Sequence, residues 1–155
     1  MFLDVENLTK SYAGNVVVDK VSFALKSGEM VGLVGPNGAG KSTTLNMLCG
    51  ILPADAGRVL LDGVTPYTDA IGFRKKIAYV PERPGLHAYA AGYDFLNFTA
   101  DAHQQPAAKI ITYAEMAGCR AYLDKPMGTL SRGQRQAVYL TAAFLAEPAL
   151  LVLDE

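Results

Sequence analysis

Residues 35–43 read Gly-Pro-Asn-Gly-Ala-Gly-Lys-Ser-Thr and fit the pattern G-x-x-x-x-G-K-[ST] in full. Glycines let this stretch wrap closely around an anion, because they lack a Cβ and accept positive φ. Backbone N–H groups then face the anion, and the positive end of a following helix adds to the attraction. Lys41 offers a full charge to terminal phosphates, and Ser42 offers a hydroxyl oxygen of the kind that Mg²⁺ prefers. The residues predicted to bind the phosphates of a nucleotide are Gly35, Pro36, Asn37, Gly38, Ala39, Gly40, Lys41, Ser42 and Thr43.

The sequence on either side of this turn supports the interpretation. The run over 29–34 is mostly apolar and predicts a strand buried on both faces of a parallel sheet. A helix is predicted over 41–49, with Gly50 at the position of a left-handed helix stop. A short Gly-rich pattern also occurs by chance in unrelated turns. Here it lies between the strand and the helix that phosphate binding requires, which favours the functional interpretation.

The remaining periodicities divide the chain into strand-rich and helical parts. Further strands are predicted at 2–8, 16–25, 57–62, 77–80 and 149–153. Helical patterns dominate from about 93 to 145. Three helices are expected there. The first contains Tyr93, Leu96 and Ala100, the second runs from Pro106 to Gly118, and the third lies between Ser131 and Pro148. The order is therefore a strand-rich part, a helical insert and a return to the sheet.

Composition excludes several classes of protein. Half of the residues are hydrophobic, which suits either a membrane span or strands buried on both faces. The longest apolar stretch, 138–153, is interrupted by Glu147 and Pro148, whereas a span needs roughly 18 uninterrupted apolar residues. Asp4 and Glu6 occupy positions that a signal peptide would make basic or apolar. The chain therefore reads as cytosolic.

The charge and the cysteine content also limit the possible functions. The net charge is −1 and the basic residues are scattered, so nucleic-acid binding is not expected. Cys49 and Cys119 have no CxxC spacing and predict two buried thiols in a reducing compartment. His87 and His103 are expected to be loop or surface residues rather than catalytic ones. The aromatic side chains expected to belong mainly to the core are Tyr89, Tyr93, Phe95 and Phe98.

Two further motifs follow in the second half of the chain. Residues 130–136 read Leu-Ser-Arg-Gly-Gln-Arg-Gln, and Ser131 with Gln134 three residues later predicts a capping box. Capping and anion binding use the same unsatisfied N–H groups, so this helix end can also face a phosphate. Residues 150–155 read Leu-Leu-Val-Leu-Asp-Glu, a buried strand that delivers Asp154 to the carboxyl edge of a sheet. There Asp154 can hold Mg²⁺ through its water shell, and Glu155 can polarise an attacking water.

Taken together, these motifs resemble those of the ATP-binding cassette (ABC) ATPases. Leu-Ser-Arg-Gly-Gln resembles the family's signature, the final hexapeptide resembles its Walker B strand, and the spacing between them is the usual one. The resemblance covers essentially the whole chain. It implies an α/β fold: a P-loop NTPase core with a mainly parallel sheet, an N-terminal antiparallel β subdomain and an inserted α-helical subdomain. Within one domain, 1–85 would be the β-rich phosphate-loop part, 86–146 the helical subdomain and 147–155 the Walker B strand.

The resemblance also implies roles for residues outside the phosphate loop. Glu155 would be the catalytic carboxylate, and Asp154 would join Ser42 in holding Mg²⁺. Tyr12 lies where the family places an aromatic ring that stacks on adenine. Glu82 replaces the family's Q-loop glutamine and would be a second catalytic residue and a further Mg²⁺ ligand; its carboxylate keeps the reach of the glutamine but adds negative charge. The residues expected to contact ATP held by a partner subunit are Ser131, Arg132, Gly133 and Gln134, of which Arg132 replaces a family glycine.

The implied function is that of an ATP-binding subunit, exporter-like in the form of residues 81–86. A head-to-tail dimer, of identical or different ATPase subunits, would bind and hydrolyse Mg-ATP and drive an integral membrane permease from the cytoplasmic face of the membrane. Part of the aromatic cluster could line the groove for that permease. Two alternatives remain: a soluble ABC-type ATPase acting on ribosomes or DNA, and a fragment that binds nucleotide without turnover.

The family's sequence continues beyond the catalytic glutamate with a subunit-contacting loop, a further buried strand and a switch histidine. The resemblance therefore implies that this domain is incomplete at its C-terminus. We expect residues 1–155 alone to lack significant ATPase activity and to expose a sheet edge that is prone to association.

Overall fold

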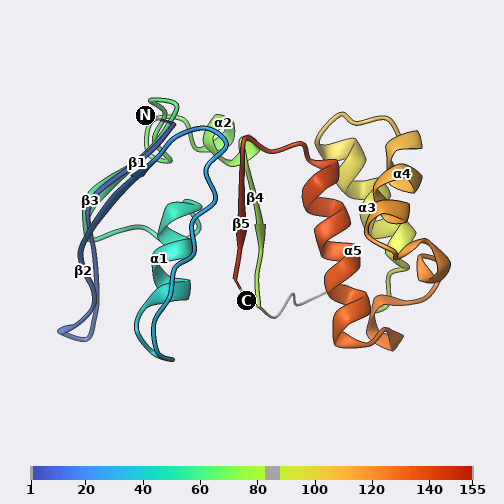
Figure 1. Cartoon of the computed structure of the whole chain (residues 1–155), viewed down its shortest axis with the longest axis horizontal. Helices are drawn as coiled ribbons and strands as arrows, with labels where there is room; N and C mark the ends of the chain where they lie inside the picture. Colours follow the sequence, from blue (N-terminus) through green and yellow to red (C-terminus); the bar gives the residue numbers. More distant parts are fainter. Residues whose placement is uncertain (1, 83–87, 155) are drawn as a thin grey trace. The chain divides into compact units, whose positions relative to one another are not determined.

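The computed structural model describes residues 2–82 and 88–154, which Figure 1 traces from end to end. The chain divides into two compact units, residues 1–76 and 77–155. Antiparallel strands dominate the first unit, whereas the second combines a parallel strand pair with helices. Within the described part of the chain, no helix is both long enough and apolar enough to cross a membrane.

The first unit is built on an antiparallel sheet with the strand order β2-β1-β3. The strands are β1 (Leu3–Tyr12), β2 (Asn15–Leu25) and β3 (Ala56–Leu61). Leu3 on the central strand pairs with Leu25 on one side and Leu61 on the other. Both Leu3 and Leu61 are fully buried. The three strands predicted in this region are confirmed, and the first continues beyond its predicted end to Tyr12.

β1 contains a bulge at Asn7, which adopts a φ of 47°. The register of β1 shifts between Val5 and Leu8 against β2, so this strand carries one extra residue there. The N–H of Asn7 donates to the hydroxyl of Ser22 over 2.7 Å, which satisfies the group that the bulge removes from the ladder. Buried positions consequently change from Leu3 and Val5 before the bulge to Leu8 and Lys10 after it.

Helix α1 (Lys41–Leu48) is confirmed almost as predicted. It follows Gly40, and Gly50 ends it with a φ of 66°, as expected for a left-handed stop. A Cβ on Gly50 would lie 2.8 Å from Cβ of Pro66, so packing also requires a glycine there. A second helix, α2 (Ala70–Lys75), was not predicted.

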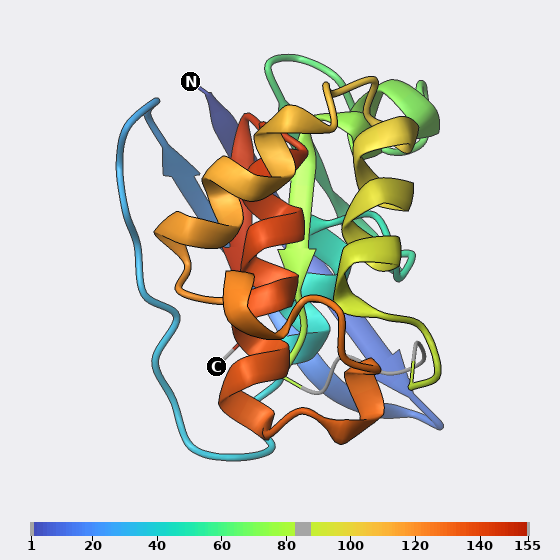
Figure 2. The ribbon, with the colours of Figure 1, turned by 90° about the vertical axis from the view of Figure 1, so that its right-hand side faces the viewer.

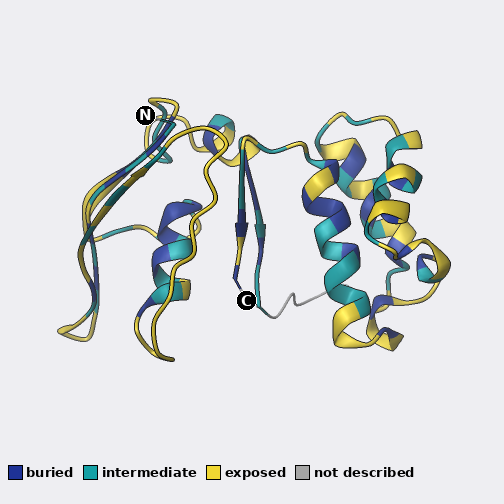
Figure 3. Cartoon of the chain, viewed as in Figure 1, coloured by how far each residue is buried: buried dark blue, intermediate teal, exposed yellow. Residues whose placement is uncertain are grey.

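The strand predicted over 29–34 is wrong for the structure. No strand is assigned between residues 26 and 40, all of which are described. Met30 and Val34 are 97% and 94% exposed, and Figure 3 shows the run leading to α1 in the exposed colour. A strand buried on both faces needs a hydrogen-bonded neighbour and side-chain cover, and neither described sheet includes this run. Apolar content alone therefore did not determine its conformation.

The second unit contains the parallel pair of β4 (Ile77–Val80) and β5 (Leu150–Leu153), in which Ile77 aligns with Leu150 and Val80 with Leu153. Its α-helices are α3 (Gly92–Ala102), α4 (Ala108–Met116) and α5 (Arg132–Leu145), and its 3₁₀ turns are η1 (Arg120–Tyr122) and η2 (Met127–Thr129). α3 and α4 both pack against α5, as Figures 1 and 2 show. The strand pair and the three predicted helices are thus present, and only α4 is shorter than its predicted range of 106–118.

A hydrophobic core joins these three helices. Its fully buried members are Leu96, Ile110, Ala114, Cys119, Val138 and Leu145. Cys49 is buried as well, as expected for both thiols. The expectation that the aromatic cluster belongs to the core is wrong for Tyr89, Phe98 and Tyr93, which are 99%, 71% and 38% exposed, whereas Phe95 packs against the core. On α3 the core face carries Leu96 and Ala100, one turn apart, and Phe98 between them points to the opposite side.

An ionic contact closes the turn between α5 and β5. Glu147 adopts a φ of 47°. Its carboxylate accepts hydrogen bonds from Lys109 at the start of α4 and from Tyr113 one turn later. These bonds, the one from Lys109 first, hold the pKa of Glu147 below its ordinary value. The turn that precedes β5 is therefore tied to the helical core.

Candidate nucleotide-binding site

The phosphate loop has the backbone that anion binding requires. Gly38 and Gly40 both adopt a φ of 82°, whereas Gly35 lies outside the positive-φ region. A Cβ on Gly40 would lie 2.6 Å from the carbonyl oxygen of Val17, so this position admits only glycine without a shift of β2. The residue that precedes α1 is Gly40, which has no side chain to cap the helix. The start of α1 is therefore suited to face an anion.

Lys41 lies across the loop. Its ammonium donates to the carbonyl oxygens of Gly35, at 2.9 Å, and Pro36, at 3.0 Å. The positive charge is therefore held beside the loop residues whose N–H groups would surround a phosphate. Both bonds are exposed, so phosphate oxygens can replace the carbonyls without breaking a buried network.

The hydroxyl residues at the start of α1 divide into exposed and buried ones. Ser42 is exposed, as a metal or phosphate contact must be, and Thr43 is half-buried. Thr44, which the sequence did not single out, is buried and donates its hydroxyl to the carbonyl of Gly40 over 2.9 Å. Thr44 thus holds the loop against the helix. Only its position after the motif could have indicated this role.

Tyr12 belongs to the same unit as the phosphate loop. It ends β1 and precedes the turn of Ala13 and Gly14, whose φ values of 48° and 83° match a two-residue hairpin turn. Tyr12 is 48% exposed. The ammonium of Lys10 lies 5.7 Å from the centroid of its ring. The ring therefore keeps accessible surface on which a base could stack.

The signature segment begins α5 with a capping box. The hydroxyl of Ser131 accepts the N–H of Gln134 at 3.2 Å, and the side chain of Gln134 accepts the N–H of Ser131 at 3.0 Å. This confirms the predicted local structure. The residues Ser131, Arg132 and Gly133 are all exposed. A Cβ on Gly133 would meet nothing within 4 Å, so the packing of this chain does not explain the glycine.

Asp154 follows β5 and is 7% exposed. Its carboxylate accepts a hydrogen bond of 3.1 Å from the hydroxyl of Tyr79 on β4, and its N–H donates to Val80. Sequence reasoning missed Tyr79, whose only signal was its place on the neighbouring strand. Glu82 follows β4, and because β4 and β5 run parallel, Glu82 and Asp154 lie at the same carboxyl edge. Glu155 and His87 lie outside the described residues.

The predicted Mg²⁺ ligands fit the chemistry of that ion. Ser42, Asp154 and Glu82 offer only hydroxyl and carboxylate oxygens, and Mg²⁺ is commonly held by one or two carboxylates together with substrate phosphates and water. The described side chains include no group of three or more His, Cys, Asp or Glu that could hold a metal alone. The phosphate loop and Tyr12 belong to the first unit, whereas the signature segment and Asp154 belong to the second. Their approach to one nucleotide remains a prediction.

In a comparison with known proteins, the chain is similar to several ATP-binding proteins. The linearmycin resistance ATP-binding protein LnrL of Bacillus subtilis is 32% identical, over 99% of this chain and 50% of its own length. The SkfA peptide export ATP-binding protein SkfE of the same organism is 34% identical, over 99% and 65%. The lipopolysaccharide export system ATP-binding protein LptB of Escherichia coli is 34% identical, over 99% and 66%. The chain thus spans between half and two thirds of the length of these relatives.

Solved structures agree with the fold. An ATP-binding subunit of an ABC transporter matches 100% of this chain with 66% of its own, at a TM-score of 0.90 and 30% identity. The structure of cbiO1 from Clostridium perfringens, part of the ABC transporter complex cbiONQ, matches 99% of this chain with 65% of its own, at a TM-score of 0.83 and 29% identity. A family model described as ABC transporter matches residues 18–155. The chain belongs to the ATP-binding domain family of the ABC transporters.

Proposed function

We propose that this chain provides the nucleotide-binding part of a transporter subunit that hydrolyses Mg-ATP to drive a membrane permease. The observation that carries the proposal is the phosphate loop, with two glycines at positive φ, a helix that starts directly after Gly40 and Lys41 held across the loop. Two of the relatives are named for export systems, which supports export as the direction of transport.

Binding would use the first unit. Lys41 would exchange its two carbonyl partners for oxygens of the β- and γ-phosphates, and the N–H groups of the loop and of α1 would surround the same phosphates. Tyr12 would stack on the adenine ring. The positive charge of Lys41 would face the negative phosphates and the ring of Tyr12 would face the base, so these contacts would select a nucleoside triphosphate.

Hydrolysis would use the edge of the parallel strand pair. Ser42 and Asp154 would hold Mg²⁺, which neutralises the charge that develops on the transferred phosphoryl group. Tyr79 would orient the carboxylate of Asp154 through its hydroxyl. Glu155 would accept a proton from the attacking water as general base, with Glu82 nearby at the same edge.

The exposed signature segment would complete the site of a second subunit. In a head-to-tail dimer, Ser131 and Gly133 of one copy would face the γ-phosphate bound by the loop of the other, with Arg132 and Gln134 beside them. The second copy would be an identical or a related ATPase subunit. The dimer would sit on the cytoplasmic face of the membrane through the permease, and the net charge of −1 gives no reason to expect nucleic acid.

Three variants of the native protein test these assignments. Lys41→Ala should abolish ATP binding and transport, whereas Glu155→Gln should keep ATP binding and lose hydrolysis. Gly133→Asp should lose hydrolysis because it brings a negative charge against the partner's phosphate. A mixture of Lys41→Ala and Gly133→Asp subunits should regain part of the activity, because one of the two shared sites is then intact.

The same variants separate the alternatives. Hydrolysis that persists in Glu155→Gln would remove Glu155 from its role, and no recovery in the mixture would contradict the head-to-tail dimer. A native complex with ribosomes or DNA, and with no membrane protein, would favour a soluble ATPase instead. Residues 1–155 alone are expected to turn over ATP poorly, and rapid turnover by a purified monomer of that length would contradict this.

A further inference from the structure

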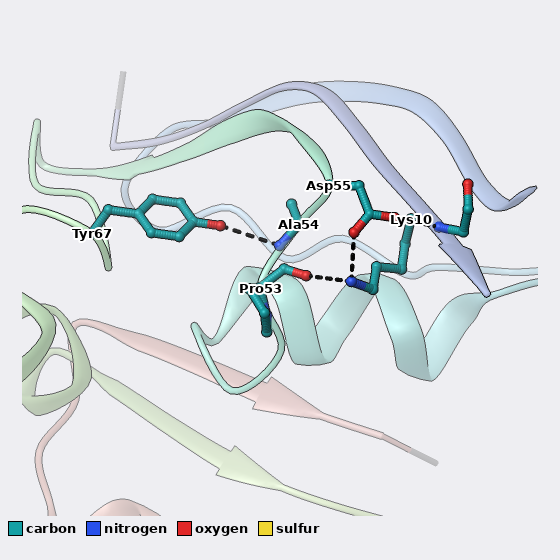
Figure 4. Close-up of polar contacts among 6 residues, drawn as sticks. Lys10, Pro53, Ala54, Asp55 and Tyr67 are labelled. Atoms are coloured by element: carbon teal, nitrogen blue, oxygen red, sulfur yellow. Dashed lines mark hydrogen bonds and ion pairs between the residues drawn. The ribbon is translucent and has the colours of Figure 1, made fainter. Parts of the chain in front are cut away.

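Lys10 is a buried charge that none of the nucleotide-binding motifs contains. It is 9% exposed, although lysine is almost never buried unless its charge is paired. Its ammonium donates to the carboxylate of Asp55 over 2.7 Å and to the carbonyl of Pro53 over 2.9 Å (Figure 4). The ammonium is therefore fixed at one point by two acceptors from the segment between α1 and β3.

Asp55 holds the end of β1 as well as Lys10. Its second carboxylate oxygen accepts the N–H of Ser11 at 2.8 Å, and its own N–H donates to the carbonyl of Thr9 at 3.0 Å. The hydrogen bond from Lys10 and then that from Ser11 lower the pKa of the Asp55 carboxyl. One aspartate thus spans three consecutive residues of β1, immediately before Tyr12.

The segment that carries these acceptors is held from its other side. The N–H of Ala54 donates to the hydroxyl of Tyr67 over 3.1 Å (Figure 4). Pro53 and Asp55 flank Ala54, so the acceptors of Lys10 lie on a fixed support rather than on a free loop.

The ammonium also faces Tyr12. Residues two apart on a strand point to the same side, which places Lys10 next to the Tyr12 ring. The distance of 5.7 Å from Nζ to the ring centroid is within the range of a cation–π contact. Since Tyr12 remains 48% exposed, the ammonium leaves ring surface accessible.

A purely structural role explains these contacts less well. In the Lys10–Asp55 pair only the lysine is buried, because the Asp55 side chain is 43% exposed. Burying a lysine beside a carboxylate is weak evidence for stability, because its charge loses hydration that the ion pair only partly replaces. The same sheet has an exposed pair, Arg58 with Glu6, in which the two charges meet over 2.8 Å at its surface. Lys10 instead brings its charge inside and directs it at an aromatic ring.

We propose that Lys10, anchored by Asp55 and Pro53, is a positioning residue that holds the Tyr12 ring ready to stack on the adenine base. The proposal rests on the proposed function, since it presumes that the chain binds ATP. Lys10 acts through Tyr12 alone, so its removal weakens recognition of the base and leaves recognition of the phosphates unchanged.

The test compares two ligands on the native protein, in EDTA so that no hydrolysis occurs. The affinity for ATP depends on contacts with both the base and the phosphates, whereas the affinity for inorganic tripolyphosphate depends on the phosphate contacts alone. Lys10→Met should weaken ATP binding about two- to fivefold, the worth of one exposed cation–π contact, and leave tripolyphosphate binding unchanged. Lys10→Arg should restore ATP binding because it keeps the cation. Lys10→Met added to Tyr12→Ala should cause no further loss.

Arg58→Met is the matched control, because it removes a charge from the same sheet without approaching Tyr12; both affinities should stay at the wild-type level. Asp55→Asn serves if Lys10→Met fails to fold, and it should weaken ATP binding alone. Equal losses for ATP and tripolyphosphate, or a further loss on the Tyr12→Ala background, would overturn the positioning role. Wild-type affinity for ATP in Lys10→Met or Tyr12→Ala would overturn it too. A wild-type protein that binds neither ligand would overturn the proposed function itself.

Discussion

Gly40→Ala should destabilise the protein more than Gly38→Ala, although both glycines have a φ of 82°. An alanine in the left-handed region costs roughly 1–2 kcal/mol, so this cost is common to both variants. At Gly38 a Cβ would meet nothing within 4 Å. At Gly40 it would lie 2.6 Å from the carbonyl oxygen of Val17 and 3.1 Å from a methyl group of Val18, so β2 must move. Overpacking of this kind adds about 1–3 kcal/mol.

The predicted loss in the free energy of unfolding is therefore about 1–2 kcal/mol for Gly38→Ala and about 2–5 kcal/mol for Gly40→Ala. Urea unfolding of the native protein, followed by circular dichroism, measures both values under one condition. The difference between the variants isolates the contact between the phosphate loop and β2. Equal losses in the two variants would refute the claim that β2 supports the loop at Gly40.

Other predictions concern the second unit. Gly133→Ala should leave stability unchanged or raise it by up to about 1 kcal/mol, yet lower ATP turnover; unchanged turnover would contradict the role of the signature surface. Tyr79→Phe should weaken the activation of hydrolysis by Mg²⁺, because Asp154 loses the hydroxyl that orients it, and an unaltered Mg²⁺ titration would dismiss that role. The pKa of Glu147 is lowered on folding, so its contribution is present above its ordinary value of 4.5 and is lost as pH falls through the lower folded value. Glu147→Gln should therefore lose less stability than the wild type as pH falls below about 4.5. Thermal melts at a series of pH values measure this, and a melting temperature that falls with pH as steeply as in the wild type would contradict it.

Local chemistry was predictable where neighbours in sequence decide it. The capping box of Ser131 and Gln134 and the positive φ of Gly38 and Gly40 follow from residues within three positions of one another. The boundaries of α1 were predictable for the same reason, because glycines stand at both ends.

Contacts between distant residues were not predictable from one sequence. Tyr79 meets Asp154 only because β4 pairs with β5, and Lys10 meets Asp55 only because the segment after α1 returns to β1. The strand predicted over 29–34 was wrong for the same reason. Whether an apolar run forms a strand depends on a neighbouring strand that pairs with it, and the residues of the run do not specify that neighbour.

The bulge at Asn7 shifts the alternation of buried and exposed residues along β1, so that odd-numbered residues are buried before it and even-numbered residues after it. If all residues of β1 alternated regularly, the pattern that buries Leu3 and Val5 would continue on odd-numbered positions and turn Lys10 outward. The bulge absorbs one residue without a change of face, so the same strand contributes Leu3 and Val5 to the hydrophobic core and still points Lys10 inward. Deleting Asn7 would remove that extra residue, and a regular strand would then keep Leu8 and Lys10 on the same face as Leu3 and Val5.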